Sequence, residues 1–402
     1  MIISYKKLRE FLANTEKYPG CKKFQRAPLI HKGFPGTFNL SFTEYDMFRV
    51  YGGYSKFSED LIFSTIQSCI RPQDITENIK QGKSLWKYLG VFEMSDIAGQ
   101  ILLSKKENIK EIHTYQLKRL IGILIALGLE KDKIYPSYQN GGKVSVITNG
   151  KFNFDYNIPE DSLTKNAFIE AGIPKENLIS DKTRDTLLSL HINMPTPWGY
   201  RNEINYNIGT KEKPLLLDIA TLEYFIWLPI FKNSEIQKNI TGLKEFSHTA
   251  SIGAFGVERL CVAINGLKSV YEIDYLKEFY DLFKKLYPSL KEEQRIKSGE
   301  VIRALHRIYS DVTEFNIDVG YHENKKIKTF LQVLVSNLKE LDKKKIKQLL
   351  EIHSKVQPWH KNLLKGIKPA IERIETYYSS QDRLRVERST KPEKHQQKKL
   401  AP

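Results

Sequence analysis

The sequence predicts an α+β protein that ends in a helical region, and three observations support this fold class. Between Gly36 and Asp96, runs of β-branched and aromatic residues are broken by Gly52-Gly53 and Pro72, as is typical of strands and turns. From His113 to Leu129, apolar residues recur with the period of a helix. After Val270 the helical period returns in one segment after another. The length of 402 residues allows two or three domains.

The elements of the first region follow from local patterns. Met1–Asn14 has the apolar spacing of a short amphipathic helix. Strands are expected at 37–42, 61–66 and 143–149. Arg201–Gly209 alternates polar and apolar residues, which predicts a strand with one polar face; its polar positions are Glu203, Asn205 and Asn207. Such a face could line a binding site.

The rest of the chain is assigned in the same way. Residues 215–228 predict a long apolar strand, and a glycine-containing turn from Gly253 precedes a helix at 257–264. Further helices are expected at 271–286, 298–312, 325–341, 343–353 and 360–378. We therefore expect an α+β domain at 1–268 and a helical domain at 269–379. A disordered basic tail without apolar period is expected at 380–402.

The composition is that of a globular protein with a strongly basic surface. Hydrophobic residues make up 41% and charged residues 27%, which excludes a globally disordered chain. The formal net charge of +16 favours a polyanionic partner such as tRNA or another nucleic acid. A lysine-rich solvated surface without such a partner is the alternative explanation, and charge alone does not choose between them.

Cysteine usage and the N-terminal segment indicate the compartment. Cys21, Cys69 and Cys261 are single and far apart, so neither a disulfide framework nor a CxxC-type zinc site is supported. The first residues lack the apolar segment of a secretion signal. No run of residues approaches the roughly 20 apolar residues that span a bilayer. We expect a cytoplasmic protein.

Three separated segments carry residue types suited to a nucleotide. They are Cys69-Ile70-Arg71-Pro72 at a strand end, Asn202-Glu203-Ile204 in the polar-faced strand, and Gly253-Ala254-Phe255-Gly256-Val257-Glu258-Arg259-Leu260 before and within a helix. Each segment alone is a weak signal. An arginine at a strand end is more often a surface charge, and glycines before a helix more often form a packing turn.

Taken in order, these segments resemble the three signature motifs of class II aminoacyl-tRNA synthetases, specifically of the alanyl branch. The last segment, Gly256–Leu260, is similar to the third motif and is the most specific. The other matching stretches are Pro35–Thr43 for the first motif, Gln67–Arg71 with Thr76–Ile79 and Leu89–Phe92 for the second, and Pro197–Ile204 and Leu217–Ile219 for two family strands. The family's two cysteines near Pro197–Ile204 are missing here.

The resemblance implies an antiparallel sheet flanked by helices, followed by an all-α domain. It also implies ATP and Mg²⁺ as cofactors, an amino acid or related carboxylate as substrate, and tRNA as partner. In such a reaction the carboxylate attacks the α-phosphorus of ATP and pyrophosphate leaves. That displacement requires cations at the phosphates and a positioned nucleophile rather than a covalent protein intermediate.

Site roles carry over residue by residue. Arg71 would contact the α-phosphate and Arg259 the γ-phosphate side, because guanidinium groups bind phosphate through paired donors. Asp218 and Glu203 would hold Mg²⁺, which prefers oxygen ligands; Glu203 could equally orient neighbouring polar groups. The remaining ATP contacts would be Trp86, stacked under the adenine unless it is a core residue, and Gly253 and Gly256, which permit close backbone approach.

The amino-acid pocket departs most from the family pattern. An aspartate that receives the α-ammonium of alanine is expected just before the third motif, but His248–Ile252 contains no acid. Thr221 stands where the family has an asparagine. Glu223 could replace the missing ammonium contact or lie at an exposed strand end. Arg201, where the family has a small residue, could bind a carboxylate or phosphate or face solvent.

The later helices are also a reduced version of the family pattern. Ile302–Tyr321 resembles the beginning of the tRNA-recognition helices, but the expected arginine-rich run is reduced to Lys325-Lys326-Ile327-Lys328. Lysine retains phosphate contacts, whereas paired base contacts by arginine would be weakened. No HxxxH sequence with a downstream cysteine and histidine occurs, so we expect this chain to lack the editing domain.

Four interpretations follow. The chain is a compact synthetase that charges tRNA, a synthetase-derived ligase that passes the activated acyl group to a small molecule or carrier, or a non-catalytic RNA-binding relative. In the fourth, it is an unrelated basic α+β protein with accidental motif matches. The joint presence of Arg71, Asp218 and Arg259 favours the first two.

Overall fold

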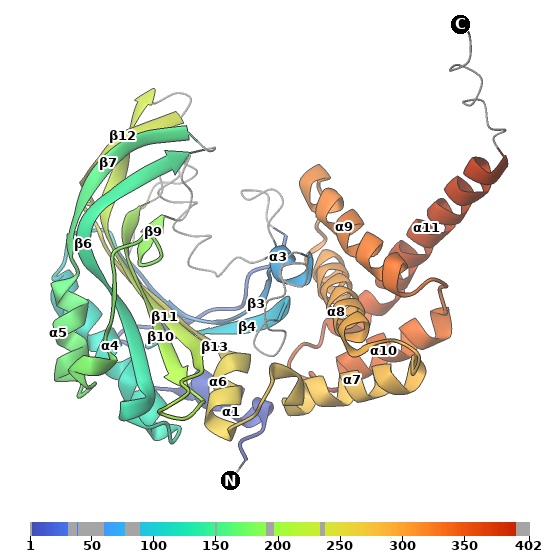
Figure 1. Cartoon of the computed structure of the whole chain (residues 1–402), viewed down its shortest axis with the longest axis horizontal. Helices are drawn as coiled ribbons and strands as arrows, with labels where there is room; N and C mark the ends of the chain where they lie inside the picture. The colour runs from blue at the N-terminus through green and yellow to red at the C-terminus, as the bar shows by residue number, and fades with distance from the viewer. Residues whose placement is uncertain are drawn as a thin grey trace, which may run out of the picture. The chain divides into compact units, whose positions relative to one another are not determined.

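The computed structural model describes residues 2–30, 38, 60–76, 89–148, 151–189, 197–233 and 238–390. The chain divides into two compact units (Figure 1). Unit 1 comprises residues 1–29, 38–71 and 84–274, and unit 2 comprises residues 30–37, 72–83 and 275–402. Unit 1 contains a large sheet with flanking helices, and the C-terminal part of the chain is helical, so the α+β prediction is confirmed.

The described strands of unit 1 form one sheet of 13 strands, whose main order is β1-β2-β5-β13-β11-β10-β6-β7. Every pairing is antiparallel except β1 with β2 and β6 with β8. The strands are β1 (Lys22–Lys23), β2 (Leu61–Ser64), β3 (Ile66–Ile70), β4 (Val91–Asp96), β5 (Gln100–Leu103), β6 (Ile134–Thr148), β7 (Lys151–Glu160), β8 (Ile179–Asp181), β9 (Leu187–Ser189), β10 (Trp198–Asn207), β11 (Leu216–Asn233), β12 (Lys238–Glu245) and β13 (Thr249–Gly256). The strands expected at 61–66, 143–149 and Arg201–Gly209 overlap β2 with β3, β6 and β10, respectively; the strand expected at 37–42 lies outside the described residues apart from Phe38.

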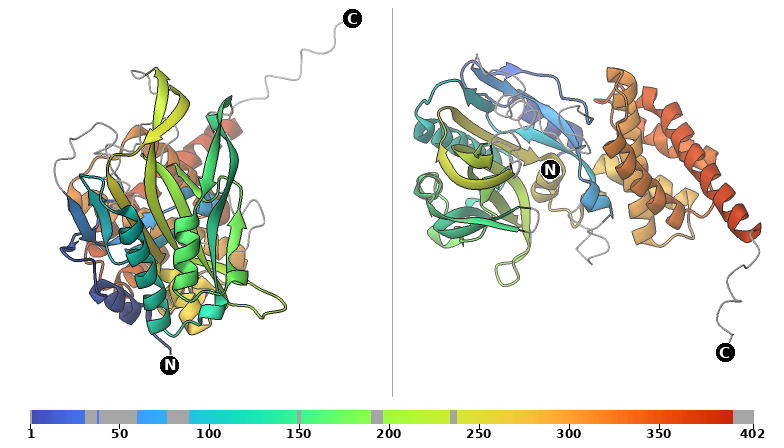
Figure 2. Two further views of the ribbon diagram at one scale, coloured as in Figure 1. Left: turned by 90° about the vertical axis from the view of Figure 1, so that its left-hand side faces the viewer. Right: turned by 90° about the horizontal axis from the view of Figure 1, so that it is seen from above.

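Helices cover one face of this sheet. α4 (Ile109–Ala126) and α5 (Ser162–Glu170) lie in front of the strands in the left view of Figure 2. α4 begins at Asn108, whose side chain accepts a hydrogen bond from the Glu111 amide. Leu117, Leu120, Ile121 and Leu124 are buried, as the helical period predicted, whereas Ile125 is 38% exposed. The other helices of unit 1 are α1 (Tyr5–Asn14) and α6 (Val257–Asn265).

The segment before α6 differs from the predicted turn. Residues 249–256 form strand β13, which pairs with β11 on one side and with β4 and β5 on the other. A Cβ added at Gly253 would lie 2.7 Å from the Leu222 side chain and 3.1 Å from that of Ile97. A larger residue at Gly253 would therefore force the Leu222 side chain to move, and α6 begins directly where this central strand ends.

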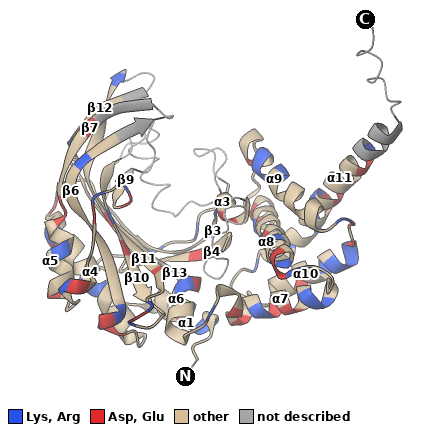
Figure 3. Cartoon of the chain, in the orientation of Figure 1, with Lys and Arg blue, Asp and Glu red and all other residues tan. Residues whose placement is uncertain are grey.

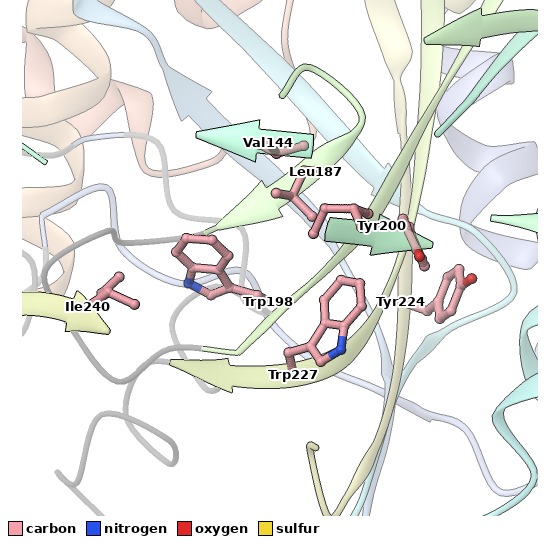
Figure 4. Close-up of a cluster of buried hydrophobic side chains, with 8 residues drawn as sticks. Val144, Leu187, Trp198, Tyr200, Tyr224, Trp227 and Ile240 are labelled. Atoms are coloured by element: carbon pink, nitrogen blue, oxygen red, sulfur yellow. The ribbon is translucent and has the colours of Figure 1, made fainter. Parts of the chain in front are cut away.

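Aromatic side chains form the largest part of one core region. Trp198 and Tyr200 of β10 pack with Tyr224 and Trp227 of β11 (Figure 4). The Tyr200 and Trp227 rings meet edge to face, with centroids 5.3 Å apart. All four residues are at most 9% exposed. This cluster fixes β10 against β11, the two strands that carry most of the predicted substrate and metal residues.

A buried polar network lies between the sheet and its helices. His113 of α4 contacts Ser251 of β13 (3.0 Å) and Thr164 of α5 (3.2 Å). Asp161 accepts hydrogen bonds from Tyr224 (2.5 Å) and Asn202 (3.1 Å). Burial lowers the pKa of His113 to about 3, so the imidazole is neutral near pH 7. Because strand side chains alternate, neighbours of Tyr224 and Asn202 on their strands face the side of the sheet away from these helices.

Unit 2 consists of helices packed around one central helix. Its described helices are α3 (Pro72–Thr76), α7 (Asp274–Leu286), α8 (Glu292–Phe315), α9 (Tyr321–Asn337), α10 (Lys343–Lys355) and α11 (Leu363–Thr390). The residues from Val301 to Asp311 of α8 are all buried. α11 continues to Thr390, into the segment expected to be disordered. Among the described helices, none has the length and apolar content needed to cross a membrane.

Candidate functional site

A pocket with about 470 Å³ of empty space, part of it open to solvent, lies in unit 1 between strands of the sheet and α6. It is built from segments far apart in sequence: the end of β3, the β4 strand, the start of β11, the end of β13 and the first turn of α6. The lining residues are Arg71, Leu89, Phe92, Met94, Asp218, Ile219, Ala220, Thr221, Ala254, Gly256, Glu258 and Arg259. Tertiary structure therefore brings together residues that sequence analysis selected separately.

Arg71 is positioned by the β3–β4 hairpin. Its backbone N–H donates to the Gly90 carbonyl (2.9 Å), which extends the hairpin pairing by one residue. Its guanidinium carbon lies 5.1 Å from the centroid of the Phe92 ring, within the range of a cation–π contact. The aromatic face therefore orients this arginine at the pocket wall.

Arg259 enters from the first turn of α6. Its Nη1 donates to Asp218 Oδ2 at 2.8 Å and to the Asp218 carbonyl at 3.3 Å. The side chains of Arg259 and Asp218 are 21% and 31% exposed. A pair exposed to this degree contributes little to stability. The Arg259 guanidinium remains accessible to a ligand, and the Asp218 carboxylate sets its position.

An irregularity in β11 explains how Asp218 and Thr221 reach the same pocket. In a regular strand, residues three apart point to opposite faces. Here the pairing with β10 shifts: Ile204 pairs with Ala220, but Asn205 pairs with Asp218. The unpaired Ile219 makes this a β-bulge, and bulges commonly redirect side chains near binding sites. The pocket depends on this extra residue.

Three half-buried charged residues lie beside the pocket on the same face of the sheet. Arg201 Nη2 donates to Glu203 Oε1 (3.1 Å), and Arg201 Nε lies 3.7 Å from Glu223 Oε1. Cross-strand pairing places Arg201 opposite Glu223 and Glu203 opposite Thr221. We call these residues the charged trio. They do not line the pocket itself, but through Thr221 they adjoin it.

Burial shapes the ionisation of both carboxyl groups in the trio. Burial raises the pKa of Glu223 to about 7, a value that the Arg201 charge lowers and the Glu203 charge raises. Burial also raises the pKa of Glu203, and the nearby Asp218 carboxylate raises it further. Since Asp218 and Glu203 repel each other, a cation between them would be favourable. Both groups therefore suit Mg²⁺, with further ligands supplied by phosphate oxygens or water.

The selected residues fall into three sets. Arg71, Asp218, Thr221, Gly256 and Arg259 meet at the pocket, whereas Arg201, Glu203 and Glu223 lie next to it. Gly253 lies in β13 and does not line the pocket. Trp86 lies outside the described residues, as do Glu77–Ile79 and, apart from Phe38, Pro35–Thr43. Within the described chain no group of three or more His, Cys, Asp or Glu forms a complete metal site.

Sequence analysis missed the pocket residues of β4. Phe92 and Met94 alternate with the buried Glu93 and line the pocket. Phe92 was included in the second-motif stretch, yet stacking was assigned to Trp86. Alternation within Val91–Asp96 could have indicated that Phe92 and Met94 share a face, but only the pairing with β3 and β13 shows that this face meets Arg71. Phe92 therefore gives the pocket an aromatic wall beside Arg71.

Unit 2 presents cations on its outer helices and buries others inside. Exposed lysines occur along α7, α9, α10 and α11 (Figure 3); they include Lys284, Lys285, Lys325, Lys328, Lys343, Lys344, Lys347, Lys355, Lys365 and Lys368. Arg303 and His306 of α8, part of the stretch that resembled recognition helices, are at most 1% exposed. Their burial excludes them from surface contacts in this structure, so an RNA contact would fall to the lysines.

Comparison with known proteins indicates a distant relationship. No protein-family profile matches the chain. The chain is 27% identical over 207 residues to an alanine–tRNA ligase of Borrelia hermsii (strain HS1 / DAH). The match covers 48% of this chain and 32% of that ligase, so the chain aligns with about a third of its relative. This similarity indicates a distant synthetase-like relationship.

Proposed function

We propose that unit 1 is a class II synthetase-like catalytic unit that binds ATP in the pocket and activates an amino acid as its aminoacyl-adenylate, which is then transferred to tRNA. The observation that carries this proposal is the convergence of Arg71, Asp218, Gly256 and Arg259 on one pocket beside an aromatic ring. The similarity to an alanine–tRNA ligase supports it independently of that geometry.

The chemistry assigned to the pocket is charge stabilisation and positioning. Phe92 would stack on the adenine, and Arg71 would hold the α-phosphate, where charge develops as the amino-acid carboxylate attacks. Arg259 would exchange its contact with Asp218 for the terminal phosphates. Gly256 leaves room for them, because a Cβ added there would meet no atom closer than 4.0 Å. The bond to the α-phosphorus forms as the bond to pyrophosphate breaks.

Mg²⁺ would be held by Asp218 and Glu203 together with phosphate oxygens. Its chemistry at this site is neutralisation of phosphate charge. Asp218 is released for this role when Arg259 turns to the phosphates. Glu203 would contribute a carboxylate whose ionisation a nearby cation would favour, since burial and, after it, the Asp218 charge raise its pKa.

The amino-acid subsite is assigned to Thr221, Glu223 and Arg201. Glu223 is a carboxylate two residues along β11 from Thr221 and on the same face, which suits the ammonium group of the substrate. Arg201 contacts both Glu203 and Glu223, and it would keep its contact with Glu203 once Glu223 binds the amine. Unit 2, with its exposed lysines, would contact the phosphates of tRNA.

The experiment that tests the proposal is exchange of labelled pyrophosphate into ATP by the full-length chain, screened across the common amino acids with and without total tRNA. Exchange with one amino acid is expected and would identify the substrate. Absence of exchange for every amino acid, together with absence of ATP binding, would contradict the proposal. Salt titration of tRNA binding should give a steep loss of affinity if lysine–phosphate contacts dominate.

A synthetase-derived ligase with a small-molecule or carrier acceptor is the second candidate. The charged trio favours it, since Arg201 and Glu223 depart from the alanyl pattern at the substrate end of the site. The same exchange samples distinguish the two: exchange with charging of tRNA supports the synthetase, and exchange without charging supports the ligase. ATP-independent RNA binding alone would favour a non-catalytic relative.

A further inference from the structure

Hydrogen bonds join the residues at the start of the N-terminal helix α1 to the end of α6. The Asn265 side chain accepts a hydrogen bond from the Ile3 amide (2.8 Å) and donates one to the Ile3 carbonyl (2.9 Å). The Tyr5 amide donates to the Asp274 carboxylate at 3.2 Å and 3.4 Å. These contacts join residues that are far apart in sequence, and Asp274 is the last residue of unit 1. They fix the start of α1, and with it the side chain of Tyr5.

The Tyr5 hydroxyl lies between two buried carboxyl groups. It is 3.0 Å from Glu93 Oε2 of β4 and 2.9 Å from Glu258 Oε1 of α6. Tyr5 is 1% exposed, and Glu93 and Glu258 are each 2% exposed. Arg9, one turn further along α1, donates from Nε to Glu93 Oε2 (3.0 Å). Two side chains of α1 therefore converge on a carboxylate of β4.

The two carboxyl groups are joined to the pocket through the backbone. Glu93 lies between Phe92 and Met94, which both line the pocket, and Glu258 lines it and precedes Arg259. The Glu93 amide donates to both oxygens of Glu258, at 3.2 Å and 3.0 Å. A shift of either carboxyl group would therefore move the aromatic wall of the pocket relative to its arginine.

We propose that α1 is a positioning element of the nucleotide pocket: through the hydroxyl of Tyr5, with Arg9 in support, it sets the distance between the Phe92 wall on β4 and Arg259 on α6. This inference rests on the proposed ATP-dependent function. The hydroxyl touches neither ATP nor the reacting atoms, so Tyr5 is a positioning residue. Its effect should appear in binding of ATP rather than of the amino acid.

The test compares two tyrosine-to-phenylalanine variants of the full chain. Tyr5→Phe removes the hydroxyl between the carboxyl groups. Tyr200→Phe is the matched control, because it removes a hydroxyl that donates to the Pro159 carbonyl (2.8 Å) in the same unit but outside the pocket. We expect Tyr5→Phe to raise the KM for ATP about tenfold, the order of effect expected for loss of one buried hydrogen bond. The KM for the amino acid should stay within about twofold, and Tyr200→Phe should change neither.

Equal KM values for ATP in Tyr5→Phe, Tyr200→Phe and the parent chain would overturn the inference while the proposed function stands. If Tyr5→Phe fails to fold, Arg9→Gln provides the second variant, since Arg9 is partly exposed. It should raise the KM for ATP by a smaller factor, and an unchanged value would overturn the inference.

A second measurement separates this inference from the proposed function. If the parent chain neither binds ATP nor exchanges pyrophosphate, the proposed function is wrong. The positioning role of α1 is then tested by hydrogen exchange at the Glu93 amide. Faster exchange in Tyr5→Phe than in Tyr200→Phe would retain α1 as the element that sets the pocket walls. Equal exchange rates in the two variants would overturn it.

Discussion

Charged side chains are arranged differently in the two units. At the pocket of unit 1, Arg259 and Asp218 form an ion pair whose side chains are 21% and 31% exposed. In α8 of unit 2, Arg303 pairs with Glu300, and their side chains are only 1% and 3% exposed. A partly exposed pair can exchange its partner for a ligand at small cost, whereas a buried pair is costly to break. The comparison separates charges suited to binding from charges that hold the helices together.

The interior of unit 2 also contains a buried histidine pair. The Nδ1 atoms of His306 and His353 are 2.9 Å apart, and His306 Nε2 lies 2.7 Å from the Leu363 carbonyl. A carbonyl only accepts, so Nε2 of His306 carries the proton and its Nδ1 accepts from His353. Within the described chain, His353 Nε2 has no hydrogen-bond partner. Both imidazoles are neutral in this arrangement, so they connect α8, α10 and α11 without burying charge.

The largest expected effect is on the stability of unit 2. Glu300→Ala should lower the free energy of unfolding by about 3–5 kcal/mol, because it removes the counter-charge of the buried Arg303 and an acceptor of the Tyr280 hydroxyl. Glu293→Ala on the same helix is the control; it breaks a more exposed pair with Lys297 and should cost at most about 1 kcal/mol. Urea unfolding measures both. Equal costs would remove the contrast between buried and exposed pairs.

Arg71→Ala tests the opposite side of the comparison. Activity in pyrophosphate exchange should fall about 10²–10³-fold, as for loss of a single group that stabilises developing charge. Stability should change little, because Arg71 lies at a strand end beside Phe92. Arg71→Lys keeps the charge but not the paired donors, and should retain intermediate activity. Full activity in Arg71→Ala would remove this arginine from the site.

Acidification should destabilise unit 2 through its histidine pair. Burial lowers the pKa of His306 to about 3 and that of His353 well below its usual value. The unfolded chain therefore binds protons first, and stability falls as the pH drops below about 6.5, by up to about 1.4 kcal/mol per pH unit for each histidine. Urea unfolding between about pH 7.5 and about pH 5 should show a smaller slope in His353→Leu than in the parent chain. His113 is present in both proteins, so its contribution cancels when the two slopes of stability against pH are subtracted. Identical slopes would contradict the prediction.

The smallest expected effect concerns Glu223 and the pH dependence of substrate binding. Its pKa is raised to about 7 by burial, so the carboxylate that suits an ammonium group forms as the pH rises through this value. The KM for the amino acid should therefore fall with rising pH, whereas Glu223→Gln should have a KM about tenfold higher and independent of pH in this range. Glu203→Gln should keep the dependence with its midpoint at lower pH, since the Glu203 charge raises the Glu223 pKa. An unaltered pH profile in Glu223→Gln would contradict this assignment.

Local pattern was sufficient for most elements and for part of the site. The helical periods and the alternation of Arg201–Gly209 correctly indicated α4, α6, β10 and the helices α7 to α11, but not α3. The motif order selected Arg71, Asp218 and Arg259, which the fold brings to one pocket. The glycines after Ile252 predict a turn, but they lie in strand β13. Small residues occur both in turns and in central strands that are closely packed, so local sequence does not separate the two. Only the partners of Gly253, Leu222 and Ile97, distinguish the two.

The sequence by itself determined the fold class and the charge balance, because periodicity and residue chemistry are local properties. Arg71, Asp218 and Arg259 were selected by the order of motifs that resemble those of a synthetase family. Tertiary structure alone decided that Ile219 bulges so that Asp218 and Thr221 share a pocket, that Phe92 faces Arg71, and that Arg303 and His306 are interior. It also placed Tyr5 between Glu93 and Glu258. These features depend on which segments pair across long sequence separations, and no local pattern records the register of that pairing.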